Sequence, residues 1–89
     1  MKALKMRRDE FVQIDLNWIA LILPGISSTR QNTTIFEFGG VTVYVTVTGK
    51  STSVKIQNHL RTSCGYIENR GDFLRCLYAV DPSFAYKIE

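Results

Sequence analysis

The residues best suited to chemistry are one histidine, His59, and two cysteines, Cys64 and Cys76. Structural zinc sites place two ligands on one turn through spacings such as C-x-x-C or H-x-x-x-H, and neither spacing occurs here. We therefore expect no metal and no cofactor. Free cysteines of this kind behave as small buried hydrophobes. A Cys64–Cys76 disulfide is the alternative, which requires the segments around them to pair as a hairpin.

Catalytic groups are equally sparse. A single histidine excludes an acid–base pair of histidines, and a Cys–His nucleophile needs a third, orienting group that nothing marks. We therefore expect a protein that is not an enzyme. The remaining enzyme hypothesis is a small metal-free nuclease using a tyrosine with arginines, because such sites have no local signature; the arginines would be Arg61, Arg70 and Arg75.

The stretch VTVTGKST ends like a phosphate-binding loop. That motif requires a glycine five residues before Gly49, where this chain has Tyr44. The preceding residues also alternate as a strand instead of forming a glycine-rich loop. Gly49-Lys50 is therefore interpreted as a turn between two strands and not as a nucleotide site.

The net charge of +3 is unevenly distributed along the chain. Four of the eleven basic residues lie in the first eight positions, which contain no acid; they are Lys2, Lys5, Arg7 and Arg8. The other 81 residues, with seven basic and eight acidic side chains, are nearly neutral. We expect residues 1–8 to form a flexible basic tail and 9–89 a single globular domain. Phosphate binding usually shows as a basic stripe on the folded surface, so this distribution weakens a nucleic-acid function.

The sequence carries no clear signal for export or for a membrane. The apolar run at 18–23 is too short to span a bilayer. Acidic residues at Asp9, Glu10 and Asp15 interrupt any signal-peptide core. Two cysteines do not make a secreted disulfide scaffold. We expect a cytoplasmic protein without a membrane partner.

Residues 33–58 predict a three-stranded antiparallel meander. Gly39-Gly40 suits a two-residue type I′ turn, and Gly49-Lys50 suits a type II′ turn. These turns pair Phe36 with Val43 and Val43 with Ile56. Both registers place one apolar set on one face, which a one-residue slip would expose. The set is Phe36, Phe38, Val41, Val43, Val45, Val47, Val54 and Ile56.

The opposite face of this meander is polar and rich in threonine. Its predicted rows are Ile35–Tyr44–Lys55, Glu37–Thr42–Gln57 and Thr33–Thr46–Ser53. Threonine forms strands well and tolerates water, so a plain solvated surface is one interpretation. The other is a flat binding surface centred on Tyr44. Its candidate residues are Ile35, Thr42, Tyr44, Thr46 and Lys55.

The segments before the meander are less clearly patterned. Residues 9–15 alternate as a strand. The apolar run at 16–23 fits either a buried strand or a short helix capped by Asp15, and the pattern does not separate them. Residues 25–32 are predicted to be a loop.

The segments after the meander also leave alternatives. Residues 59–65 predict one helical turn closed by Gly65. For 73–80, a helix with Asp72 as its N-cap is preferred over a hairpin turning at 68–71. Residues 84–88 alternate as a last strand.

Together these elements predict a β-rich α+β domain, an antiparallel meander at 33–58 with one or two short helices. An all-β small barrel is the alternative if both ambiguous segments are strands. By elimination we expect a small non-catalytic protein-binding module of the inhibitor or adaptor type, with a mobile element as one candidate source. The alternative is a nucleic-acid-binding protein that uses the basic tail and the sheet face. Self-association through a sheet edge stays open.

Overall fold

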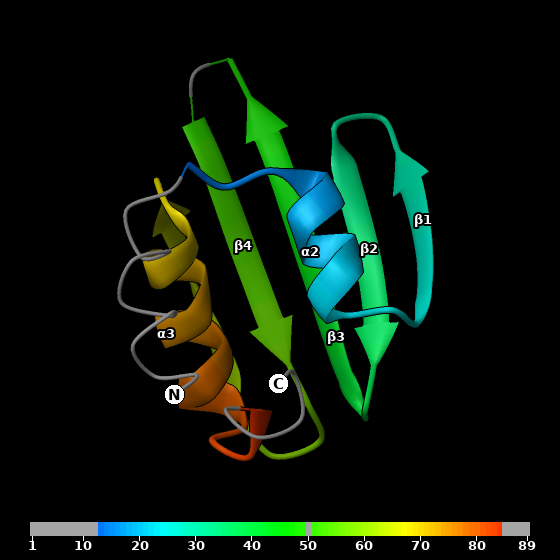
Figure 1. The fold of residues 1–89 in the computed structure, drawn as a ribbon, viewed down its shortest axis with the longest axis vertical. Helices are drawn as coiled ribbons and strands as arrows, with labels where there is room; N and C mark the ends of the chain where they lie inside the picture. Colours follow the sequence, from blue (N-terminus) through cyan, green and yellow to red (C-terminus); the bar gives the residue numbers. More distant parts are fainter. Residues whose placement is uncertain (1–12, 50, 85–89) are drawn as a thin grey trace.

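The computed structural model describes residues 13–49 and 51–84. Within these ranges five strands form one antiparallel sheet in chain order, and the two described helices lie on the same face of it (Figure 1). The elements are α2 (Leu16–Ile22), β1 (Ile26–Arg30), β2 (Thr33–Phe38), β3 (Val41–Thr48), β4 (Ser51–Gln57), β5 (Thr62–Ile67) and α3 (Arg70–Val80). The sheet is open. The predicted α+β meander with short helices is therefore confirmed, and the small-barrel alternative is wrong.

The predicted registers of the meander are confirmed. Phe36 pairs with Val43, and Val43 pairs with Ile56. Both central residues of the first turn have positive φ, 61° at Gly39 and 82° at Gly40. Glycine adopts this conformation without steric cost, so the turn fixes the register on both sides of it.

Two predictions beside the meander were wrong. Residues 26–30 form the edge strand β1 instead of a loop, and 62–67 form the edge strand β5 instead of part of a helical turn. Both segments are short and rich in serine and threonine, so neither shows a strong apolar alternation. Their strand conformation comes from pairing with β2 and β4, a tertiary effect that outweighs local pattern.

Helix α2 resolves the ambiguity at 16–23. Its N-cap is Asp15, whose Oδ1 accepts a hydrogen bond of 2.8 Å from the Trp18 backbone N–H. This satisfies one of the backbone donors that every helix start leaves unpaired. The helical alternative, including its predicted cap, is thus confirmed.

Helix α3 covers β4 and β5, so the hairpin alternative is wrong. The predicted N-cap was also wrong: Asn69, not Asp72, caps the helix and accepts from the Asp72 N–H at 2.9 Å. Asn caps as well as Asp. Asp72 lies inside the first turn, where its Oδ2 accepts from the Glu68 N–H at 3.0 Å and its other oxygen pairs with Arg75. The Glu68 N–H, followed by Arg75, lowers the pKa of Asp72.

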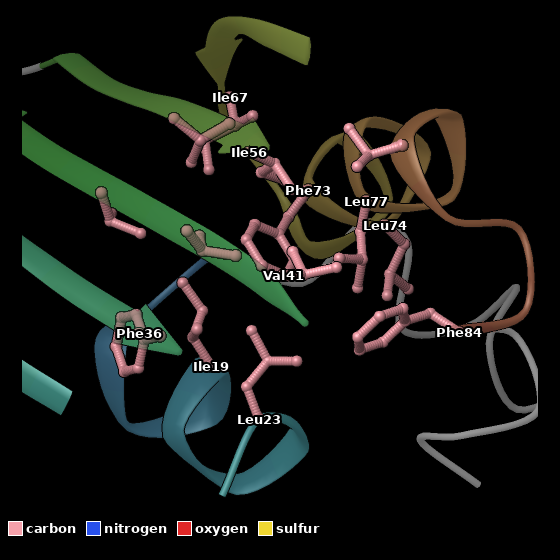
Figure 2. Packing of buried hydrophobic residues seen from close by; sticks show 14 residues of the cluster. Ile19, Leu23, Phe36, Val41, Ile56, Ile67, Phe73, Leu74, Leu77 and Phe84 are labelled. Atoms are coloured by element: carbon pink, nitrogen blue, oxygen red, sulfur yellow. The ribbon is translucent and has the colours of Figure 1, made fainter. Parts of the chain in front are cut away.

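The core lies between the helices and one face of the sheet (Figure 2). Trp18 of α2 meets Phe73 of α3 edge to face, with ring centroids 5.7 Å apart, so the two helices contact each other as well as the sheet. Phe38 and Phe84 make a similar contact at 5.9 Å. The predicted apolar set is buried or half-buried with one exception. Val47, near the end of β3, is 43% exposed.

Several predictions fall on residues outside the described ranges. These are the tail at 1–8, most of the strand at 9–15 and nearly all of the strand at 84–88. Of the described parts, Gln13 forms an antiparallel bridge with Asn69, and Phe84 is fully buried. Within the described ranges no helix is long and apolar enough to cross a membrane.

Candidate binding surface

One face of the sheet carries no helix among the described residues. We call it the open face. Its side chains alternate with those of the core along all five strands, because successive residues of a strand point to opposite sides. The described side chains assigned to it by register are Ser28, Arg30, Thr33, Ile35, Glu37, Thr42, Tyr44, Thr46, Thr48, Ser51, Ser53, Lys55, Gln57, Thr62, Cys64 and Tyr66.

The five residues predicted from the sequence all lie on this face. Strand pairing joins Ile35 to Tyr44 and Tyr44 to Lys55 in one row. The structure extends that row at both ends, with Ser28 on β1 and Cys64 on β5. The Lys55 Nζ lies 5.9 Å from the centroid of the Tyr44 ring, within cation–π range. Thr42 and Thr46 occupy the neighbouring rows.

Sequence reasoning missed the most exposed aromatic residue of the face. Tyr66 is 81% exposed and pairs with Ser53, one row away from Lys55 and Cys64. It was missed because 62–67 was not recognised as a strand. The alternation of Thr62, Cys64 and Tyr66 was the available signal. Gly65 masked it by suggesting the end of a helical turn.

A shallow hollow lies between the two tyrosines. It is lined by Thr33, Tyr44, Thr46, Ser53, Val54, Lys55, Cys64, Gly65 and Tyr66. Small hydroxyl side chains lie between the larger Tyr44 and Tyr66, and the hydroxyls of Thr33 and Thr46 are hydrogen-bonded to each other at 3.1 Å. This bond uses part of the hydrogen-bonding capacity of the two hydroxyls.

The charge of the open face is close to neutral. Arg30 and Lys55 are its basic residues, and Glu37 is acidic. These three groups lie on different strands and form no basic stripe. The basic residues that give the chain its positive charge, at 1–8, lie outside the described ranges. The electrostatic feature expected of a phosphate-binding surface is therefore lacking on the described sheet face.

The groups considered for metal, disulfide and nucleotide chemistry are dispersed. In the parts of the chain that are described, no three metal-ligating side chains come together. Cys64 lies on the open face, whereas Cys76 on α3 packs against the core on the other side of the sheet. Both are free thiols, so the disulfide alternative is wrong. The expectation that both cysteines are buried is also wrong, because Cys64 is exposed and Cys76 is half-buried. Gly49 has a φ of 56° in the turn after β3, as the turn interpretation requires.

Comparisons with protein-family models, with curated proteins and with solved structures found no match to this chain.

Proposed function

We propose that this protein is a small non-catalytic protein-binding module that acts by occupying a partner's surface with its open face. The supporting observation is the hollow between Tyr44 and Tyr66 on a sheet face that no described helix covers. Tyrosines supply large contact area at low cost in conformational entropy, and they dominate many protein interfaces.

The rest of the face suits the same role. Serine and threonine surround the two tyrosines, and this combination of rigid aromatic anchors with small adaptable hydroxyls is typical of surfaces that recognise proteins. Because the stable core lies on the other face, the open face can contact a partner without changing the fold. A mode of action as inhibitor or adaptor, in the cytoplasm, belongs to the same proposal.

The proposal is tested by affinity capture from soluble extract, with and without nuclease, using the tagged full chain. Tyr44→Ala combined with Tyr66→Ala should abolish recovery of a discrete, nuclease-resistant protein partner and leave the thermal midpoint nearly unchanged. The matched control is Leu60→Ala, which removes an exposed large side chain from the 58–61 loop, away from the hollow. Equal loss of the partner in the control, or full retention in the tyrosine variant, would contradict the proposal.

Nucleic-acid binding is the second candidate, favoured by the contact between Lys55 and the Tyr44 ring. A base could stack on the tyrosine while the lysine meets a phosphate. Fluorescence anisotropy with a labelled single-stranded oligonucleotide tests it. This function requires affinity that falls steeply with salt and is reduced both by removing residues 1–8 and by Tyr44→Ala. Affinity indifferent to salt and to both changes would exclude it.

A further inference from the structure

The edge strand β1 has the features of a surface for a second copy of this chain. Among the described strands it ends the sheet on one side, and it pairs regularly with β2 over its whole length. It contains neither proline nor lysine, and its one charged residue, Arg30, is the last of the strand. Natural edge strands are usually protected by such residues, by a bulge or by a covering element. Among the described residues no helix covers β1, and Ser27 and Thr29 are exposed although they point to the helix side of the sheet.

The turn after β1 determines which backbone groups of the strand point away from β2. Gln31 and Asn32 form a two-residue connection, so Arg30 and Thr33 are the closing pair and direct their backbone groups at each other. The pairing of β2 with β3 agrees with this assignment. The Asn32 carbonyl oxygen accepts from the Val47 N–H of β3, so position 32 points away from β1 and Thr33 points toward it. Alternation along β1 then turns the N–H and C=O of Ser27 and Thr29 outward, away from β2.

This pattern is self-complementary about one position. If a two-fold axis passes beside Ser28, the outward groups of Ser27 meet those of Thr29 in the second copy, and the reverse pairing forms at the same time. With the axis at Ser27, Thr29 would lie opposite position 25 of the second copy. With the axis at Thr29, Ser27 would lie opposite position 31. Both positions are outside β1, so the backbone pairing would be incomplete. Closed two-fold symmetry is the commonest arrangement of soluble oligomers.

Charge supports the same register. Position 26 on β1 pairs with Glu37 on β2. The two-fold places Arg30 of the second copy next to position 26, in the row that contains Glu37. Opposite charges thus approach across the junction, while the uncharged Ser28 lies at the axis. Like charges lying opposite each other at the axis would oppose association.

The helix α2 supplies a second, independent observation. At 3.6 residues per turn, Leu16 and Ala20 lie on the flank opposite Trp18, which contacts α3. That flank therefore faces the β1 side of the molecule, and both residues are exposed. Leu21, on the outer surface, is 78% exposed. A helix that is apolar on nearly all sides is usually buried on more than one.

From these features we propose that two copies of this protein pair through β1 in antiparallel fashion, about a two-fold axis at Ser28, into one continuous sheet. The two α2 flanks then face each other above the junction. Both open faces lie on the same side of the combined sheet, because the axis is perpendicular to it. The inference does not rest on the proposed function.

The test is the solution mass of the full chain by sedimentation or light scattering over a concentration series. We expect a species of twice the chain mass of 10.1 kDa. Ser27→Pro removes an outward N–H without breaking a β2 pairing and should give a monomer. Ser27→Ala keeps that N–H and should stay dimeric. A monomer for the unchanged chain at every concentration would overturn the proposal.

A pair of substitutions with opposite charge at Ser28 locates the interface even if the proline variant fails to fold. Ser28→Lys and Ser28→Glu should each be monomeric alone, because like charges then lie opposite each other. Mixing them should restore a mixed dimer. Dimers that persist unchanged in both variants would show that the copies associate elsewhere, and the β1 interface would be rejected.

Discussion

The two faces of the sheet differ completely although the same strands build them. On β3, Val43 and Val45 are buried against the helices, while Tyr44 and Thr46 between them lie on the open face. Residues one position apart thus serve separate purposes. Substitutions on the covered face change stability first, and those on the open face can change recognition alone.

Phe73→Ala should be the most damaging substitution. Phe73 is fully buried and contacts Trp18, so its removal leaves a cavity where α2, α3 and the sheet meet. We expect a loss of about 3–5 kcal/mol in the free energy of unfolding. That is a large part of the roughly 5–15 kcal/mol available to a domain. Chemical denaturation measures it directly.

The matched change on the open face is Tyr66→Ala, which also removes an aromatic ring. Because this ring is mostly exposed, its loss should alter unfolding by no more than about 0.5 kcal/mol. A cost comparable to that of Phe73→Ala would mean that both faces support the fold, and the separation between them would fail.

Two glycines test how tightly the backbone is packed at different places. A Cβ on Gly25, just before β1, would lie 1.9 Å from the Glu37 carbonyl oxygen, a backbone atom that cannot move away easily. Gly25→Ala should therefore cost about 1–3 kcal/mol, the range for overpacking. The denaturation midpoint of the variant gives the result.

Gly65 on β5 is the contrasting case. It pairs with Val54 and points to the covered side, yet a Cβ there meets nothing within 4 Å. Gly65→Ala should stabilise the protein by about 0.5–1 kcal/mol, because alanine loses less backbone entropy in a strand. A destabilised Gly65→Ala variant would show that the space next to Gly65 does not accept a methyl group.

The smallest expected effect is the pH dependence due to Asp72, which holds the start of α3. Its folded pKa is lowered, so its contribution is present above the ordinary carboxyl pKa and is lost as the pH falls through the folded value. The effect should stay below about 1 kcal/mol because the pair with Arg75 is at the surface. Denaturation midpoints between pH 7 and acid should fall less steeply for Asp72→Asn than for the unchanged chain. Equal slopes would assign the acid sensitivity to other carboxyls.

The part of the fold predictable from sequence was the part in which two signals agreed. Between Thr33 and Gln57, glycine turns and alternation independently demanded the same register. At β1 and β5 only one weak signal was present, because Ser and Thr are compatible with loops and strands alike. At α3 the pattern favours a helix. Asn69 and Asp72 are both good N-cap residues, and only the backbone geometry shows which of the two caps the helix.

The candidate surface was predictable only on the strands that were predicted. Tyr44 and Lys55 followed from the meander, whereas Tyr66 depended on a strand that was not recognised. The hollow is lined by residues of β2, β3, β4 and β5. Predicting its outline therefore also required the pairing of β4 with β5. For Cys64 and Cys76, spacing alone left a disulfide open until α3 placed Cys76 on the other side of the sheet.

The order of the strands has a consequence for how the chain folds. Each of the five described strands pairs only with its sequence neighbours, so every contact between these strands closes a short loop. Short loops cost little entropy, and proteins dominated by near-neighbour contacts fold quickly. The sheet can grow hairpin by hairpin from the Gly39-Gly40 turn, with α2 and α3 docking from either end of the chain. Newly made chains would then expose the valines of β3 to the cell only briefly.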